Sequence, residues 1–234
     1  MKYLQTETIM GDNDSAEDAV PSTQKIEMRL ADLQQQLADL DEAAPLAERL
    51  QLELDSGYAL LELNRFDEAS TLAHTLFDRA LDAKLWQHAV EACDILFQSE
   101  QADSVIALAH GIWLGVTFPI DPELTVAMLQ HLIDETPDRS DGAAVAAAVA
   151  NYIVDLRADE QSRENLLFFT NQLLGQVARR HSQVEEQEIF DFWVQQLELD
   201  QPDKFLPRLA KVLDVLVNGD WWYDRDALRA QIPD

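Results

Sequence analysis

The sequence contains few of the residues that interrupt helices. Only 7 of its 234 residues are glycine and 8 are proline. Alanine, leucine, glutamine and glutamate dominate, and all four are favourable in helices, whereas runs rich in β-branched residues are scarce. Hydrophobic residues make up 47% of the chain, which is enough for a buried core. We therefore predict an all-α fold of antiparallel helical hairpins, arranged as a solenoid or as a compact helical bundle.

Cysteine and long apolar runs are also scarce. The one cysteine, Cys93, cannot form a disulfide within the chain, and a cytoplasmic location is the usual context for such a protein. No apolar run reaches the length of about 20 residues that a membrane helix needs. The first residues lack the apolar segment of a secretory signal. We expect a cytoplasmic protein without a membrane partner.

Basic residues are outnumbered by acidic ones. The chain has 17 lysines and arginines against 44 aspartates and glutamates, which gives a net charge of -27. Such a surface repels phosphate groups, so direct nucleic-acid binding is not expected. A partner with a basic surface fits the charge. An acidic surface that is merely well solvated, or that reflects a salt-rich habitat, fits it as well.

The sequence lacks the motifs of catalysis and metal binding. Its five histidines form neither an HExxH motif nor a close pair with metal-ligand spacing. Phosphate-binding glycine loops and the GxSxG turn are missing. Two acidic stretches, 12–17 and 138–142, begin like calcium loops, but neither completes that pattern. We expect no catalytic residues, no cofactor and no metal, and hence no enzymatic activity.

The pattern along the chain predicts its organisation. Residues 1–21 are polar and acidic and are predicted to be a disordered tail, followed by one all-helical domain over 22–234. The alanine-rich segment 143–157 predicts a central helix that packs closely on its neighbours. An apolar seam with heptad-like spacing favours the first helix of a bundle over a short coiled coil; it consists of Ile26, Leu30, Leu33, Leu37 and Leu40.

Residues 57–69, GYALLELNRFDEA, raise the question of one helix or two. Asn64 tolerates the left-handed conformation that ends a helix. Asp67 suits the first turn of a new helix, where the helix dipole favours a carboxylate. We therefore predict two antiparallel helices joined by a tight turn. The small residues Gly57 and Ala69 are expected to face each other and to let these helices approach closely.

This stretch resembles a known repeat. The spacing of Gly57, Leu60, Asn64, Phe66 and Ala69 is similar to that of the tetratricopeptide repeat. A weaker copy follows at Cys93, Leu96, Glu100, Ala102 and Val105, without the glycine and the aromatic residue. The resemblance covers about 47–116 and leaves 119–234 as a further helical region. It implies a protein-interaction module whose inner helices, near 47–62 and 86–98, line a groove for a protein client.

Seven residues are candidate partner contacts. Five are expected to face outward from the two inner helices: Glu53, Glu62, Gln87, Glu91 and Asp94. The other two, Trp221 and Trp222, are adjacent, so on a regular element their side chains point apart. One can enter the core while the other serves as an interface anchor. The alternative is that this aromatic segment caps the last helices.

These patterns favour a cytoplasmic adaptor, scaffold or assembly chaperone that binds a basic or amphipathic protein client. A second hypothesis is an acidic mimic of nucleic acid that blocks a DNA-binding protein. The sequence leaves open which client is bound, and also whether the chain forms a homodimer.

Overall fold

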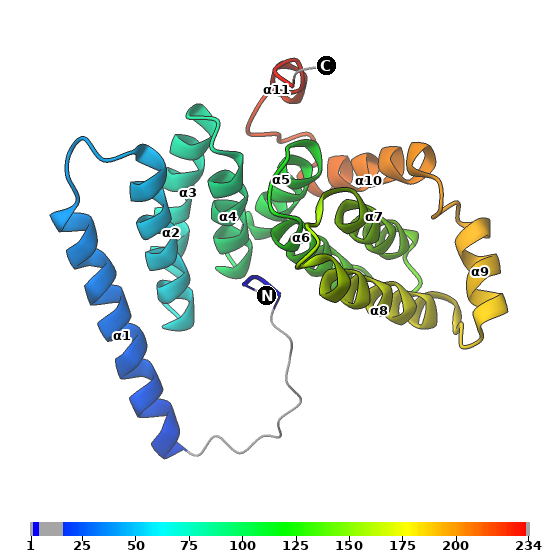
Figure 1. Cartoon of the computed structure of the whole chain (residues 1–234), viewed down its shortest axis with the longest axis horizontal. Helices are drawn as coiled ribbons and strands as arrows, with labels where there is room; N and C mark the ends of the chain where they lie inside the picture. The colour runs from blue at the N-terminus through cyan, green and yellow to red at the C-terminus, as the bar shows by residue number, and fades with distance from the viewer. Residues whose placement is uncertain (1, 5–15, 233–234) are drawn as a thin grey trace. The chain divides into compact units, whose positions relative to one another are not determined.

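The computed structural model describes residues 2–4 and 16–232, with side chains described from residue 23 onward in the first helix. Within these residues the chain forms eleven α-helices and no strand, which confirms the all-α prediction (Figure 1). The chain divides into two units. We name them the N-terminal unit, residues 5–107, and the C-terminal unit, residues 1–4 together with 108–234.

The N-terminal unit contains four helices in succession: α1 (Ala16–Asp39), α2 (Leu46–Glu62), α3 (Phe66–Asp82) and α4 (Trp86–Gln98). Each packs on the next in antiparallel fashion, and α2 also packs on α4 (Figure 1). Leu30 and Leu33 of the apolar seam are buried, and α1 packs on α2. This arrangement agrees with the first helix of a bundle, the alternative that we favoured. Most of the predicted disordered tail lies outside the described residues, but α1 already begins at Ala16.

The turn between α2 and α3 confirms the prediction of two helices. Asn64 has a φ of 55°, in the left-handed region. The N–H of Arg65 donates to the carbonyl of Leu60 and the N–H of Asn64 to that of Leu61, both at 2.9 Å. These are the two bonds of a Schellman motif, which satisfies carbonyls that a helix end leaves without partners. The turn between α3 and α4 repeats the motif, with Lys84 at a φ of 58°.

Gly57 has a different neighbour from the one we expected. A Cβ atom on Gly57 would lie 2.8 Å from Cδ1 of Ile95, and its nearest contacts all belong to that side chain. The expectation that Gly57 faces Ala69 is therefore wrong. Gly57 opens α2 toward α4, whereas Ala69 is buried on α3. The spacing of small residues predicts a close approach, but it does not show which helix approaches.

The C-terminal unit is built around α7. Its helices are α5 from Leu108 on (α5 spans Ser104–Thr117), α6 (Pro122–Glu135), α7 (Asp141–Arg157), α8 (Arg163–Ser182), α9 (Gln187–Gln196), α10 (Pro202–Val217) and α11 (Arg225–Arg229). Three of them, α6, α8 and α10, pack on α7. Residues 143–150 of α7 are all buried, because their small side chains admit a helix on every side. The predicted central position of this alanine-rich helix is confirmed.

Arginine side chains close helix ends in this unit. The guanidinium of Arg157 donates to the carbonyls of Gly115 and Val116 at 2.6 Å and of Phe118 at 2.9 Å. These carbonyls belong to the last turn of α5 and the residue after it, where partners within the helix are missing. Arg180 likewise donates to the carbonyl of Ile133 at the end of α6, at 2.9 Å. These two arginines therefore serve the fold itself.

Candidate partner-binding surfaces

Two of the predicted contact residues on α4 are buried. Glu91 is 1% exposed and Asp94 is 4% exposed, so the expectation that they face outward is wrong. Every residue of α4 from 89 to 96 is buried. The Oδ2 atom of Asp94 accepts hydrogen bonds from the Tyr58 hydroxyl and the Gln98 amide, both at 2.9 Å. A client has no access to these two carboxylates in this structure.

The two predicted carboxylates of α2 lie nearer the surface and form ion pairs. Glu62 pairs with Arg29 of α1 at 2.7 Å, and both side chains are about half exposed. Glu53 pairs with Arg79 of α3 at 2.6 Å and is more enclosed. An exposed pair such as that of Arg29 and Glu62 contributes only about 0–1 kcal/mol, so its loss costs little. Gln87 is half-buried in the first turn of α4.

An open cleft of about 470 Å³ lies between α1 and α2. It is lined by Gln36, Asp39, Leu40, Glu48, Gln51 and Leu52. Leu40 and Leu52 are half-buried, whereas Asp39 and Glu48 are exposed. The cleft therefore joins apolar surface to negative charge, and none of its lining residues is basic. Sequence reasoning missed this site, although Leu40 ends the apolar seam just beyond the last helical residue of α1.

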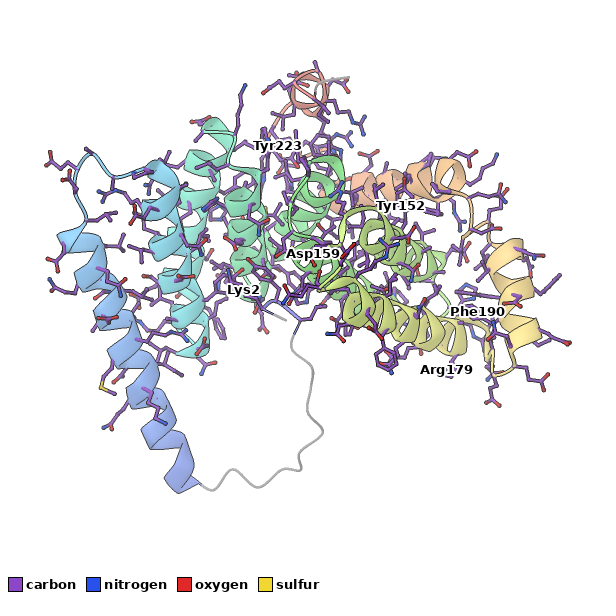
Figure 2. All side chains as sticks on the ribbon, viewed as in Figure 1. Lys2, Tyr152, Asp159, Arg179, Phe190 and Tyr223 are labelled. Carbon is purple, nitrogen blue, oxygen red and sulfur yellow. The ribbon has the colours of Figure 1, made fainter. Side chains whose placement is uncertain are left out.

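The aromatic segment at the C-terminus packs around His110 of α5. The His110 ring stacks on Trp222 at 4.2 Å between centroids and lies 4.9 Å from Trp221. The backbone N–H of Trp222 donates to Nε2 of His110 at 2.9 Å, and the Tyr223 hydroxyl donates to the His110 carbonyl at 3.0 Å. Figure 2 shows Tyr223 between α5 and α11.

This packing resembles the first of our two alternatives, in which the aromatic segment caps the last helices and does not serve as a partner anchor. Trp221 and Trp222 are both half-buried. The indole N–H of Trp221 donates to Asp214 at 3.2 Å, and the Arg225 guanidinium lies 4.1 Å from the centre of the Trp221 ring. We predicted that adjacent tryptophans point apart, but residues 220–224 are not helical. Both rings can therefore contact the same histidine.

A hydrogen-bonded series of Ser182, His181 and Asp141 resembles the catalytic triad of a serine hydrolase. Nδ1 of His181 lies 2.6 Å from the Ser182 hydroxyl, and Nε2 lies 3.0 Å from Asp141. However, the indole N–H of Trp193 also points at Nδ1, at 3.2 Å. An indole N–H only donates, so it competes for the nitrogen that would take the proton of serine. The arrangement suits a link between α7, α8 and α9 better than nucleophilic catalysis.

Cys93 and the acidic residues offer little other chemistry. Burial raises the pKa of the Cys93 thiol well above its usual value, so the thiol stays protonated and is a poor nucleophile. Among the residues that the structure describes, no three histidine, cysteine or acidic side chains are grouped closely enough to hold a metal ion. In the same part of the chain, no helix has the length and hydropathy that a membrane crossing requires.

The chain matches no protein-family model, no curated protein and no solved structure. The resemblance to the tetratricopeptide repeat therefore rests on the spacing of residues within this sequence.

Proposed function

We propose that this protein is a non-enzymatic interaction module whose cleft between α1 and α2 receives a basic, amphipathic segment of a protein client. The observation that carries the proposal is the lining of the cleft. Leu40 and Leu52 offer half-buried apolar surface, and Asp39 and Glu48 place exposed carboxylates beside it. This combination suits a segment that carries both apolar and basic side chains.

Each part of the cleft has its own role in binding. An apolar side chain of the client contacts Leu40 and Leu52 and supplies most of the affinity, because burial of apolar surface dominates such contacts. Lysine or arginine residues of the client approach Asp39 and Glu48, and their charge speeds the encounter and fixes the orientation. Glu62 extends the negative charge along α2 once Arg29 is displaced.

A tetratricopeptide-like arrangement of hairpins supports a role as adaptor, scaffold or assembly chaperone in the cytoplasm. Stacked helical pairs present extended surfaces for protein binding. The burial of Glu91 and Asp94 moves the proposed client surface from the inner face of α4 to the side of α2 that packs on α1.

A selection from a library of displayed peptides tests the proposal. The full chain is the bait, and a second bait carries Asp39→Lys and Glu48→Lys. We expect the parent to enrich peptides that combine apolar residues with lysine and arginine. These peptides should bind the reversed variant at least about tenfold more weakly, a change of about 1.4 kcal/mol.

The matched control reverses two exposed acids of α3, Asp78→Lys and Asp82→Lys, and thereby makes the same change in net charge. It should bind the selected peptides nearly as well as the parent does. Equal weakening in both variants would show that only net charge matters and would refute the cleft. The acidic-mimic hypothesis predicts instead that the chain displaces DNA from a basic protein and that the cleft variant does so unimpaired.

A further inference from the structure

Helix α9 carries a buried tryptophan and, beside it, exposed apolar residues. Trp193 is buried, and its indole N–H bonds to His181 of α8. Figure 2 shows Phe190 on the side of α9 that faces α8. Ile189 and Phe192 are 51% and 63% exposed. They lie three residues apart and therefore share one face of the helix.

Two large exposed side chains on one short helix form a recognisable surface. Single exposed apolar residues are normal on a protein surface, whereas adjacent ones on one face mark interaction sites. We name Ile189 and Phe192 the outer face of α9. The helix has 10 residues, about 15 Å in length, so the outer face fits a partner segment of two to three helical turns.

The charge of the segment that carries the outer face is of one sign. Between Ser182 and Asp203 the chain has no lysine or arginine. The same stretch contains seven acidic residues, all of them exposed: Glu185, Glu186, Glu188, Asp191, Glu198, Asp200 and Asp203. An apolar surface flanked by carboxylates complements an apolar stripe flanked by ammonium or guanidinium groups.

We propose that the outer face of α9 is a docking site for a basic amphipathic helix of another protein. Charge complementarity selects this occupant. A second copy of the chain brings the same acidic residues and a net charge of -27, so the two copies repel each other. Anionic membranes and nucleic acids are repelled for the same reason. The proposal concerns the C-terminal unit and is independent of the cleft between α1 and α2.

A labelled peptide of leucine and lysine tests this site. With about 18 residues and leucine at helical spacing, it is long enough to form an amphipathic helix on binding. A peptide with glutamate in place of lysine is its control. The full chain is titrated into each peptide, and fluorescence anisotropy reports binding. We expect the lysine peptide to bind, its affinity to fall as salt is raised, and the glutamate peptide not to bind.

Two phenylalanine variants locate the binding. Phe168 of α8 is 65% exposed, nearly the same as Phe192, but it does not lie in the acidic stretch. Both are made in the Asp39→Lys/Glu48→Lys variant, so that the cleft does not bind the peptide. There, Phe192→Ser should weaken binding at least tenfold, and Phe168→Ser should change it less than twofold. Ile189→Ser is a second variant that tests the same face. Because all three side chains are exposed, circular dichroism should show the parental helix content for each variant.

Hydrogen exchange distinguishes this site from the cleft. We expect the lysine peptide to slow exchange in residues 187–196, and this protection should persist in the Asp39→Lys/Glu48→Lys variant. Equal effects of Phe192→Ser and Phe168→Ser, protection confined to α1 and α2, or no binding of the lysine peptide would each overturn the proposal. If only the cleft variant lost binding, the proposal of a binding cleft would be supported and the proposal of a site on α9 would be refuted.

Discussion

The Cδ1 methyl of Ile95 lies 2.8 Å from the position that a Cβ atom on Gly57 would occupy. Two carbon atoms do not approach this closely without displacement. A glycine inside a helix costs about 1 kcal/mol relative to alanine, so Gly57 weakens α2 in isolation. What it permits is the packing of Ile95, a fully buried side chain of α4, against the backbone of α2.

Adding a methyl group at Gly57 and removing one from Ile95 should together leave the stability of the protein unchanged. Gly57→Ala alone is expected to destabilise the protein by about 1 kcal/mol, because overpacking outweighs the gain in helix propensity. Ile95→Val alone should also cost about 1 kcal/mol through the cavity that it leaves. In the double variant the new methyl fills the space of the old one. Urea unfolding should place the double variant near the parent.

The control is Ala59→Gly in the same helix, combined with Ile95→Val. Ala59 is also a buried residue of α2. It is a control because the Ile95 side chain is the nearest neighbour of Gly57. We expect the effects of this control pair to add. If the effects of Gly57→Ala and Ile95→Val also added, the methyl exchange would be refuted.

Local signals in the sequence predicted the helices and their ends. Asn64 and Asp67 are examples, because a left-handed residue and a carboxylate in the first helical turn depend on their immediate neighbours. Asn64 ends α2 in the left-handed conformation, and Asp67 lies in the first turn of α3, as their positions in the sequence indicate. The central place of the alanine-rich helix was predictable too, since few other sequences allow close packing on all sides.

The surfaces of the helices were harder to predict. Glu91 and Asp94 are polar, and a helix period alone suggests that they face water. Their burial depends on tertiary contacts that the local pattern does not contain. The cleft was missed for the same reason, since Leu40 and Glu48 come from opposite ends of a loop. The face of α9 escaped notice because Ile189 and Phe192 follow the same spacing as a core stripe.

Lys84 should be replaceable by glycine with a gain in stability. Its φ of 58° is unfavourable for a residue with a Cβ atom. Glycine adopts this φ without a steric cost. Part of the gain is lost, because glycine also increases the conformational entropy of the unfolded chain. We expect Lys84→Gly to stabilise the protein by about 0.5–1 kcal/mol, measured by urea unfolding. Ala83→Gly is the matched control, since Ala83 has a φ of -82°, and it should destabilise the protein.

Arg157 should be among the most sensitive positions of the C-terminal unit. Burial lowers the pKa of its guanidinium, but the group remains charged at neutral pH and serves three carbonyls. Arg157→Met should cost about 2–4 kcal/mol, because those carbonyls lose charged donors. Arg163→Met is the control, since Arg163 forms an exposed pair with Asp155, and it should cost less than about 1 kcal/mol. Similar thermal melts for the two variants would contradict this role of Arg157.

Cys93 should make stability depend on pH in the alkaline range. Burial is the main cause of its raised thiol pKa, and the charge of Asp94 adds to it. When the folded pKa lies above the unfolded one, the contribution to stability is complete below the unfolded pKa of about 8.5 and is lost as the pH rises above it. Stability should therefore fall by up to about 1.4 kcal/mol per pH unit above that value.

Urea unfolding of the parent and of Cys93→Ala at pH values on both sides of 8.5 isolates this effect. The other titrating groups are common to both proteins, so the difference between their free energies of unfolding belongs to the thiol. We expect that difference to change with pH in the alkaline range. A constant difference would show that the thiol ionises as easily in the folded chain as in the unfolded one.

His110 should hold the C-terminal aromatic segment in place. A backbone N–H only donates, so the bond from Trp222 requires Nε2 of His110 to be an unprotonated acceptor. His110→Phe keeps a ring that can stack on Trp222 but removes the acceptor of its half-buried N–H, and the loss of such a hydrogen bond costs about 0.5–1.5 kcal/mol. We expect faster hydrogen exchange and proteolysis in residues 218–232 of this variant, while exchange in α7 stays unchanged and serves as the internal control. His110→Gln, whose side-chain oxygen can accept the same bond, should restore part of the protection. If His110→Phe exchanged like the parent, ring stacking would be sufficient to hold the segment, and the hydrogen bond to His110 would contribute nothing measurable.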